Sequence, residues 1–225
     1  GKASDFFFIE STTPESALDQ IIDLVTTRLP GYYRIDPIRD IQVLTPMQRG
    51  LVGAANLNRM LQERLNPTRE PMGKPSLSRA GMEYRLNDKV MQIKNDYDKE
   101  VFNGDIGTIT DVNIEDQQLT ITFDGRDVLY ERSDLDEVVL AYATTIHKSQ
   151  GSEYPIVVLP FMMTHFVMLQ RNLLYTAVTR AKKVLVLVGE RKAIGYAIRN
   201  QKPNERNTRL HVRLRGDTGK IATLV

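Results

Sequence analysis

The feature that most constrains the fold is an alternation of strand and helix patterns that stops in the middle of the chain and then resumes. Near the N-terminus, DFFFIE (5–10) and IQVLTP (41–46) are short apolar runs typical of buried strands, and each precedes apolar residues at helical spacing. Towards the other end, VVLAYAT (138–144), YPIVVLP (154–160) and VLVLVG (184–189) have the same character. Such alternation predicts an α/β protein, with a parallel sheet covered by helices.

Four helices are predicted between these strands. The first has Thr12 and Glu15 at capping-box spacing and Pro14 in its first turn, and it is expected to end at Pro30-Gly31. The other three are expected at 50–67, 170–183 and 190–200.

The interruption consists of short strand-like runs joined by turn signals. The runs are KVMQIKN (89–95), DIGTITDV (105–112), QLTITF (118–123) and RDVLYE (126–131). Short strands with tight turns such as Asn103-Gly104 predict a small antiparallel barrel inserted into the α/β unit. The expected organisation is a first α/β segment at 1–80, the barrel at 81–137, a second α/β segment at 138–200 and a basic tail at 201–225.

Charge is divided unevenly along the chain, although the net charge is only +2. From Asp96 to Glu137 there are 13 acidic residues against 3 basic, and from Arg171 to the C-terminus there are 13 basic residues against 3 acidic. The basic part could meet phosphates, whereas the acidic barrel should repel them on average and could bind another protein. Ordinary solvated surfaces would give the same counts, so both interpretations stay open.

Composition argues against several classes of protein. The chain has no cysteine, which excludes disulfides and thiolate metal sites, and its three histidines lack ligand spacing, so no metal site is expected. No apolar run is long enough to cross a bilayer, and the N-terminus lacks a signal pattern. We therefore expect a cytoplasmic protein without membrane contact.

One polar segment, TTIHKSQGSEY (144–154), lies between two predicted strands. Loops at the carboxyl ends of parallel strands commonly carry functional groups. Thr145, His147 and Lys148 supply hydrogen bonds here, and Gly151 lets backbone N–H groups approach a phosphate or a sugar. A solvated turn without a special role remains an alternative.

Two further segments could hold an anion. In YTAVTRAKK (175–183), Arg180 lies in a predicted apolar helix, where its guanidinium could neutralise charge in phosphoryl transfer. A surface arginine with a snorkelling stem is the simpler alternative. In LTPMQRG (44–50), Gln48 and Arg49 follow a strand and precede a helix, a position suited to anion contact.

Together and in this order, LTPMQRG, TIHKSQGSEY and YTAVTRAKK resemble motifs IV, V and VI of superfamily 1 helicases. The resemblance is to the RecD-like branch, whose relatives include conjugative relaxase-helicases, and it covers roughly residues 5 to 200. That branch carries a small SH3-like barrel between motifs IV and V, where the short strands fall here. The resemblance therefore implies a RecA-like parallel sheet flanked by helices, with an inserted SH3-like barrel.

The resemblance also implies roles for the matching residues. Arg180 would be the arginine finger on the γ-phosphate of ATP, assisted by Arg49 with Gln48 beside it. The nucleotide would be bordered by Gly151 and Glu153, with Glu153 near the ribose, and single-stranded DNA would be faced by Thr145, His147 and Lys148. The implied function is the C-terminal motor domain of an ATP-dependent 5′-to-3′ DNA helicase, with ATP and Mg²⁺ as cofactors.

A P-loop, GxxxxGK[ST], is missing from the sequence. Gly73-Lys74 is followed by proline, GDTGK (216–220) has the wrong spacing, and no Asp-Glu pair resembles a Walker B motif. We therefore expect the C-terminal part of a longer protein, whose N-terminal RecA-like domain supplies the phosphate cradle and the magnesium ligands, and no ATP hydrolysis by this chain alone. The alternatives are a nucleic-acid-binding or protein-interaction module that has lost ATPase function, and the motor of a conjugative relaxase.

Overall fold

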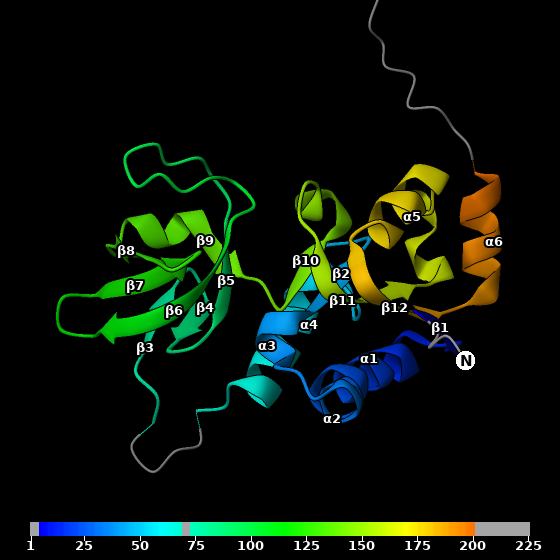
Figure 1. Ribbon diagram of the computed structural model, residues 1–225, viewed down its shortest axis with the longest axis horizontal. Helices are drawn as coiled ribbons and strands as arrows, with labels where there is room; N and C mark the ends of the chain where they lie inside the picture. Colours follow the sequence, from blue (N-terminus) through cyan, green and yellow to red (C-terminus); the bar gives the residue numbers. More distant parts are fainter. Residues whose placement is uncertain (1–4, 69–72, 201–225) are drawn as a thin grey trace, which may run out of the picture.

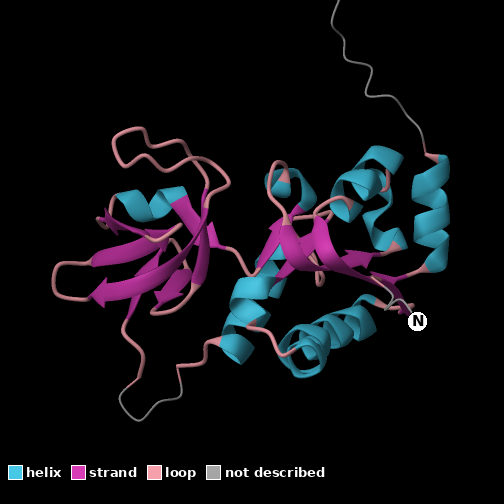
Figure 2. Ribbon diagram, in the orientation of Figure 1, coloured by secondary structure: helices cyan, strands magenta, loops and turns pink. Residues whose placement is uncertain are grey.

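The structure is a computed structural model that describes residues 5–68 and 73–200. A parallel sheet flanked by helices and a smaller antiparallel sheet lie side by side (Figure 1, Figure 2). The predicted basic tail at 201–225 lies outside the described residues. Within the described ranges, no helix has both the length and the apolar character needed to span a membrane.

The parallel sheet has five strands in the order β1-β12-β11-β2-β10. They are β1 (Phe6–Glu10), β2 (Ile41–Thr45), β10 (Ala143–Thr145), β11 (Tyr154–Phe161) and β12 (Ala181–Gly189). The longer helices of this α/β part are α1 (Pro14–Asp23), α4 (Ala54–Leu65), α5 (Arg171–Val178) and α6 (Arg191–Arg199). Shorter helical segments are α3 (Pro37–Asp40), η2 (Asp134–Glu137), η3 (Ile146–Ser149) and η4 (Met163–Met168).

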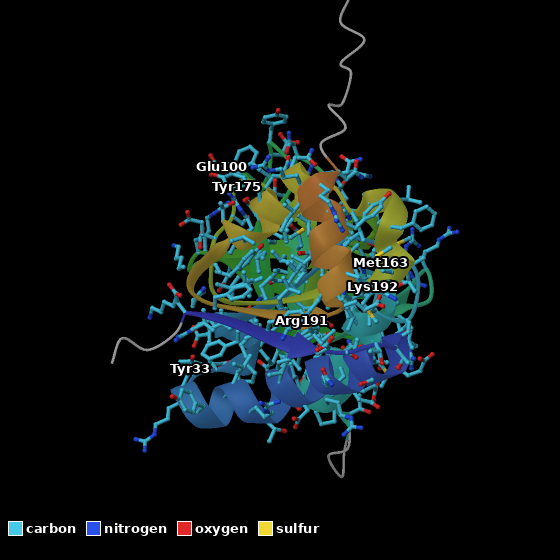
Figure 3. All side chains as sticks on the ribbon, turned by 90° about the vertical axis from the view of Figure 1, so that its right-hand side faces the viewer. Tyr33, Glu100, Met163, Tyr175, Arg191 and Lys192 are labelled. Atoms are coloured by element: carbon cyan, nitrogen blue, oxygen red, sulfur yellow. The ribbon has the colours of Figure 1, made fainter. Side chains whose placement is uncertain are left out.

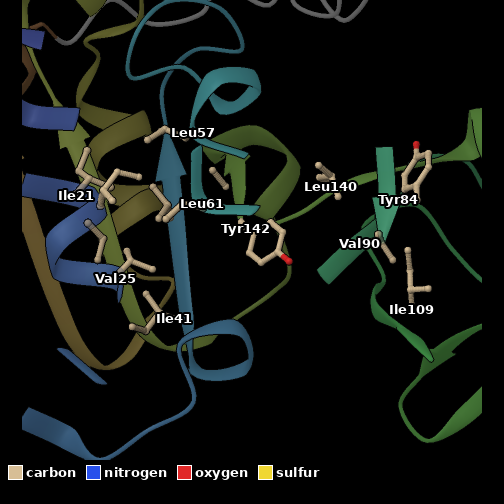
Figure 4. Close-up of a cluster of buried hydrophobic side chains, with 14 of the residues drawn as sticks. Ile21, Val25, Ile41, Leu57, Leu61, Tyr84, Val90, Ile109, Leu140 and Tyr142 are labelled. Carbon is tan, nitrogen blue, oxygen red and sulfur yellow. The ribbon is translucent and has the colours of Figure 1, made fainter. Parts of the chain in front are cut away.

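Both faces of the parallel sheet are buried, in two separate clusters. Val184 and Val186 of β12 join the cluster that contains residues of α1 and α4, whereas Leu185 and Leu187 join the cluster of α5 and α6. This follows from the alternation of side chains along a strand. Burial on both faces explains why the strands are continuous apolar runs. Figure 4 shows Ile21 of α1 and Leu61 of α4 in the first cluster.

The first helix is capped differently from the prediction. Thr13 is the N-cap of α1, and its hydroxyl accepts a hydrogen bond from the backbone N–H of Ser16 at 3.2 Å. The predicted capping box of Thr12 and Glu15 is therefore wrong, whereas Pro14 does stand in the first turn.

The same helical segment also runs past its predicted end. After α1 the chain continues through a π-helical turn, η1 (Leu24–Arg28), into α2 (Leu29–Tyr33). Pro30 stands where the π-helical turn passes into α2, so its missing N–H falls at a change in the hydrogen-bond pattern of the segment. The helix ends at Arg34, whose φ of 54° is left-handed.

The antiparallel sheet has the strand order β8-β7-β6-β5-β9. Its strands are β5 (Lys89–Gln92), β6 (Ile106–Asn113), β7 (Gln118–Phe123), β8 (Arg126–Tyr130) and β9 (Val138–Leu140). A hairpin of β3 (Ser76–Arg79) and β4 (Met82–Arg85) packs against it, since the Tyr84 hydroxyl donates to the Val138 carbonyl oxygen at 2.6 Å. Sheet and hairpin, residues 76–140, are called the barrel below. The strands predicted between 89 and 131 are all present.

The strand predicted at 138–144 is in fact two strands. Val139 of β9 pairs with Met91 in the barrel, whereas Ala143 of β10 pairs with Val43 in the parallel sheet. The chain therefore passes from one sheet to the other at residues 141–142. A single apolar run conceals this change because both strands are buried. The division of the chain at residues 80/81 and 137/138 stays a prediction.

Two predicted helices are shorter than expected. α5 ends at Val178, and β12 begins at Ala181, opposite Tyr154 of β11, so Arg180 lies in a turn rather than inside a helix. Strand pairing here outweighs the helical propensity of the residues after Arg180. Residues 50–53 are likewise a loop before α4, held by a hydrogen bond from the Thr45 hydroxyl to the Val52 carbonyl oxygen at 2.8 Å.

Candidate functional site

The predicted site residues lie at two opposite edges of the parallel sheet. Gln48 and Arg49 follow the carboxyl end of β2, and Thr145 is the last residue of β10. Arg180 and Glu153 instead precede the amino ends of β12 and β11. Parallel strands all run in one direction, so these two groups of residues are separated by the length of the sheet.

The separation is about 20 Å. Ile41, the first residue of β2, pairs with Ile156, the third residue of β11. Tyr154 therefore lies two positions before this pair along β11, and Thr45 lies four positions after it along β2. Six positions at roughly 3.3 Å each give about 20 Å. Arg49 lies in the loop that follows Thr45, and its role beside Arg180 stays a prediction.

At the amino edge, Arg180 is fixed by three neutral oxygen atoms. Its Nη1 donates to the carbonyl oxygen of Ser152 at 3.0 Å, its Nε to the carbonyl oxygen of Thr176 at 3.2 Å, and its Nη2 to the hydroxyl of Thr179 at 3.2 Å. The backbone of Arg180 is held as well, because its carbonyl oxygen accepts from the N–H of Tyr154 at 2.8 Å. The half-buried guanidinium therefore has a defined position.

The charge of Arg180 is not compensated within the described residues, where no carboxylate lies within salt-bridge distance of it. Glu153, the residue after Ser152, pairs with Lys182 at 3.4 Å instead. Arg85 is the opposite case, because it is buried and pairs with both Glu63 and Glu83. Arg85 thus has a structural role, whereas Arg180 keeps a positive charge that an anion could neutralise.

The charge of Arg180 also acts on its neighbour. Burial raises the pKa of the Tyr154 hydroxyl, and Ser152 and Arg180 oppose that rise. Because Arg180 donates to the carbonyl oxygen of Ser152, it also lies close to Gly151 and Glu153, the two residues that flank Ser152 in the chain.

The segment between Thr145 and Tyr154 crosses from the carboxyl edge to the amino edge. Its first part is the short helix η3, where Ser149 is buried and its hydroxyl donates to the Ile146 carbonyl oxygen at 2.8 Å. His147 and Lys148 are exposed on the same turn. Gly151 then has a φ of 88°, a left-handed conformation that favours glycine. One loop therefore carries candidate groups for both edges.

At the carboxyl edge, a groove of about 400 Å³ lies between α4 and the barrel. Gln48, Thr145 and Lys148 line it from the parallel-sheet side, and Met82 and Met91 line it from the barrel. The exposed Lys148 gives this groove a positive charge at its rim. Arg49 and His147 do not line it, although they follow the same strand ends.

Two other basic residues of the C-terminal half are paired with acidic ones. Arg191 and Lys192, which Figure 3 shows at the start of α6, lie 3.5 Å from Glu10 and 2.9 Å from Glu190. Their charges are therefore less available to phosphates than the residue count suggests. Among the described residues, no group of three or more His, Asp or Glu side chains could hold a metal ion.

Sequence reasoning missed a set of polar residues on the buried side of α4. Asn58, Gln62 and Asn66 recur every four residues and are all buried. Asn58 donates to the Ala143 carbonyl oxygen and accepts from the Ala143 N–H, both at 2.8 Å, and so fixes β10. Their spacing was the available signal, because buried amides on one helix face must find partners.

The comparisons with known proteins agree with this architecture. The ATP-dependent RecD-like DNA helicase SH3 domain matches residues 57–123, and the UvrD-like helicase C-terminal domain matches residues 140–188. The crystal structure of the Pif1 helicase from Bacteroides in complex with ADP-AlF3 and ssDNA covers 91% of this chain, with half of its own chain matched, a TM-score of 0.51 and 16% identity. At that identity, the likeness shows a shared fold alone.

Two curated relatives share more of the sequence. The chain is 40% identical over 175 residues to the ATP-dependent RecD2 DNA helicase of Deinococcus radiodurans, and 32% identical over 161 residues to the RecBCD enzyme subunit RecD of Haemophilus influenzae. These matches cover 78% and 71% of this chain, but only 23% of each relative.

Parallel sheet, covering helices and inserted barrel together define the C-terminal part of a superfamily 1 helicase, with a RecA-like domain and an SH3-like domain. The predicted fold class is thus confirmed. Within this class, the chain belongs to the RecD-like family.

Proposed function

We propose that this chain is the C-terminal motor domain of an ATP-dependent DNA helicase that moves 5′ to 3′ on single-stranded DNA. The observation that carries the proposal is Arg180, a guanidinium fixed by three neutral oxygens with no carboxylate partner among the described residues. A preorganised cation of this kind stabilises the charge that develops in phosphoryl transfer. The relative named as an ATP-dependent RecD2 DNA helicase supports the same interpretation.

The nucleotide would lie at the amino edge. Arg180 would act as the arginine finger, and Gly151 and Glu153 would border the nucleotide. ATP with Mg²⁺ supplies the phosphoryl group and the charge that neutralises its oxygens when bound. The sequence contains no P-loop. In this proposal the phosphate cradle and the magnesium ligands therefore come from an N-terminal RecA-like domain that faces this edge.

The DNA would lie at the carboxyl edge. Thr145, His147 and Lys148 would contact its backbone, where hydroxyl and cationic groups suit phosphate oxygens. Gln48 and Arg49 follow the carboxyl end of β2. Their role beside Arg180 at the γ-phosphate, which the resemblance implies, stays a prediction. The loop from Thr145 to Tyr154 would then connect the DNA with the nucleotide.

The test uses the full-length protein and forked DNA with either a 5′ or a 3′ single-stranded tail. ATP-dependent strand separation of the 5′-tailed fork only is the expected result. Unwinding from the 3′ tail would overturn the direction. An absence of DNA-stimulated ATP hydrolysis would favour the alternative of a binding module without ATPase function.

A protein partner for the acidic barrel stays a prediction. It is tested by measuring whether Asp111→Asn and Asp127→Asn weaken the binding of a basic protein.

A further inference from the structure

A buried carboxylate connects the barrel to α4. Asp88, in the turn between β4 and β5, is fully buried. Its Oδ2 accepts from Gln62 Nε2 at 2.6 Å and from the backbone N–H of Arg85 at 2.7 Å. Its Oδ1 accepts from Asn66 Nδ2 at 2.7 Å and from the Tyr142 hydroxyl at 2.8 Å. Four donors therefore satisfy one carboxylate.

These donors come from different parts of the fold. Gln62 belongs to α4, which covers the parallel sheet, and Asn66 is the C-cap of that helix, whereas Tyr142 belongs to the link between the two sheets. Figure 4 shows Tyr142 between the cluster around Leu61 and the barrel residues Val90 and Ile109. Asp88 thus joins the barrel, the link and the helix at one point.

The nearby cations do not pair with Asp88. Arg85 directs its guanidinium to Glu63, Glu83 and the Asn66 carbonyl oxygen. The result is a carboxylate whose burial raises its pKa, while its four hydrogen bonds oppose that rise. A buried carboxylate in such a network is sensitive to the loss of any donor, because each unsatisfied oxygen bears its full desolvation cost.

We propose that Asp88 is a positioning residue that holds the barrel at a fixed orientation to α4 and thereby sets the width of the groove between them. The groove lies on the same elements, because α4 and the barrel form its two walls and Gln62 lines it. α4 also begins at the loop of Gln48, and its Asn58 fixes the backbone of β10 just before Thr145. The barrel, the loop before α4 and the start of η3 are therefore held as one unit.

The test measures the spread of distances between the barrel and the parallel-sheet part. The chain has no cysteine, so spin labels can be placed at Asp19→Cys on α1 and Glu115→Cys in the turn after β6, both exposed positions. Asp88→Asn puts an amide N–H₂ against two donors and should broaden the distance distribution. Tyr142→Phe removes one donor and should broaden it less.

Asp136→Asn is the matched control. It changes an exposed carboxylate that pairs with Arg79 at 2.7 Å inside the barrel, and it should leave the distribution unchanged. An unchanged width in folded Asp88→Asn would overturn the proposal. If Asp88→Asn does not fold, the same distances are measured in Tyr142→Phe and Gln62→Met. An unchanged width of the distance distribution in both variants would also overturn the proposal.

A second measurement rests on the proposed function. In the full-length protein, Asp88→Asn should lower the number of base pairs unwound per ATP several-fold and leave DNA-stimulated ATP turnover near its parental value. A purely structural role would lower both in parallel. Since the distance measurement needs neither ATP nor DNA, its outcome is separate from that of the proposed function.

Discussion

Arg180 Nη1 lies 3.0 Å from the carbonyl oxygen of Ser152, so the last turn before β12 is joined to the loop before β11. Lysine cannot reproduce this arrangement, since it lacks the planar fork that donates to three acceptors at once. The position of the charge thus depends on arginine.

Arg180→Ala in the full-length protein should reduce ATP turnover by about 10³-fold, while single-stranded DNA binding is retained. Steady-state ATP hydrolysis and a DNA-binding titration measure the two effects. Arg171→Ala, an exposed arginine at the start of α5, is the matched control and should keep normal turnover. Near-normal turnover in Arg180→Ala would remove the finger role.

Lys148→Ala should weaken binding of single-stranded DNA and reduce the dependence of the logarithm of affinity on the logarithm of salt concentration by about one. The reason is that each lysine on a phosphate releases about one counterion. Binding isotherms at several salt concentrations measure the slope. Lys192→Ala, whose lysine pairs with Glu190, should leave it unchanged. Equal slopes for Lys148→Ala and the parent would argue against contact at η3.

The free energy of unfolding should rise with pH in the alkaline range because of Lys89. It is buried with its Nζ donating to the Ile41 carbonyl oxygen at 3.1 Å, and burial lowers its pKa to about 8, although Asp36 and Asp40 oppose this. The unfolded chain binds the proton more tightly, so the free energy of unfolding should increase from pH 8 to about 10.5, by roughly 3 kcal/mol at most. Below pH 8 this contribution levels off, because both the folded and the unfolded chain then bind the proton. Urea unfolding across this range measures it, and a Lys89→Met chain with the same slope would disprove the assignment.

The free energy of unfolding should fall in acid because of His165. It is buried, and burial lowers its pKa to about 4, with Glu190 opposing this shift. The unfolded histidine protonates first, so stability should decrease as the pH falls from about 6.5 towards 4 and level off below that. His165→Asn should flatten this part of the profile. A profile that keeps its full slope in the variant would assign the acid sensitivity to other groups.

Gly189→Ala should destabilise the fold by about 3 kcal/mol or more. Gly189 has a φ of 149°, and a Cβ there would lie 2.1 Å from the Phe161 carbonyl oxygen, a backbone atom that cannot move aside easily. Gly31→Ala is the contrasting control, because nothing lies within 4 Å of its Cβ and it stands in α2, where alanine is favoured by about 0.5–1 kcal/mol. Thermal unfolding compares the two, and a Gly189→Ala chain as stable as the parent would contradict the close packing of β12 on β11.

The sequence by itself determined the class of fold and the identity of the polar segments. A strand buried on both faces needs a continuous apolar run such as VLVLV, and a strand buried on one face needs an alternating run such as QLTITF. Both patterns are local and can be recognised in the sequence. The strands of the barrel and the order of LTPMQRG, TIHKSQGSEY and YTAVTRAKK could therefore be predicted from the sequence.

Only the tertiary structure decided which of those segments meet. The split of 138–144 into β9 and β10, and the turn at Arg180 in place of helix, both depend on pairing with strands distant in sequence. The direction shared by all strands of the parallel sheet then placed Arg180 at the amino end of β12 and Thr145 at the carboxyl end of β10. Asp88 likewise became visible only when α4, the link and the barrel were brought together, because hydrogen-bond partners tens of residues apart leave no periodic trace in the sequence.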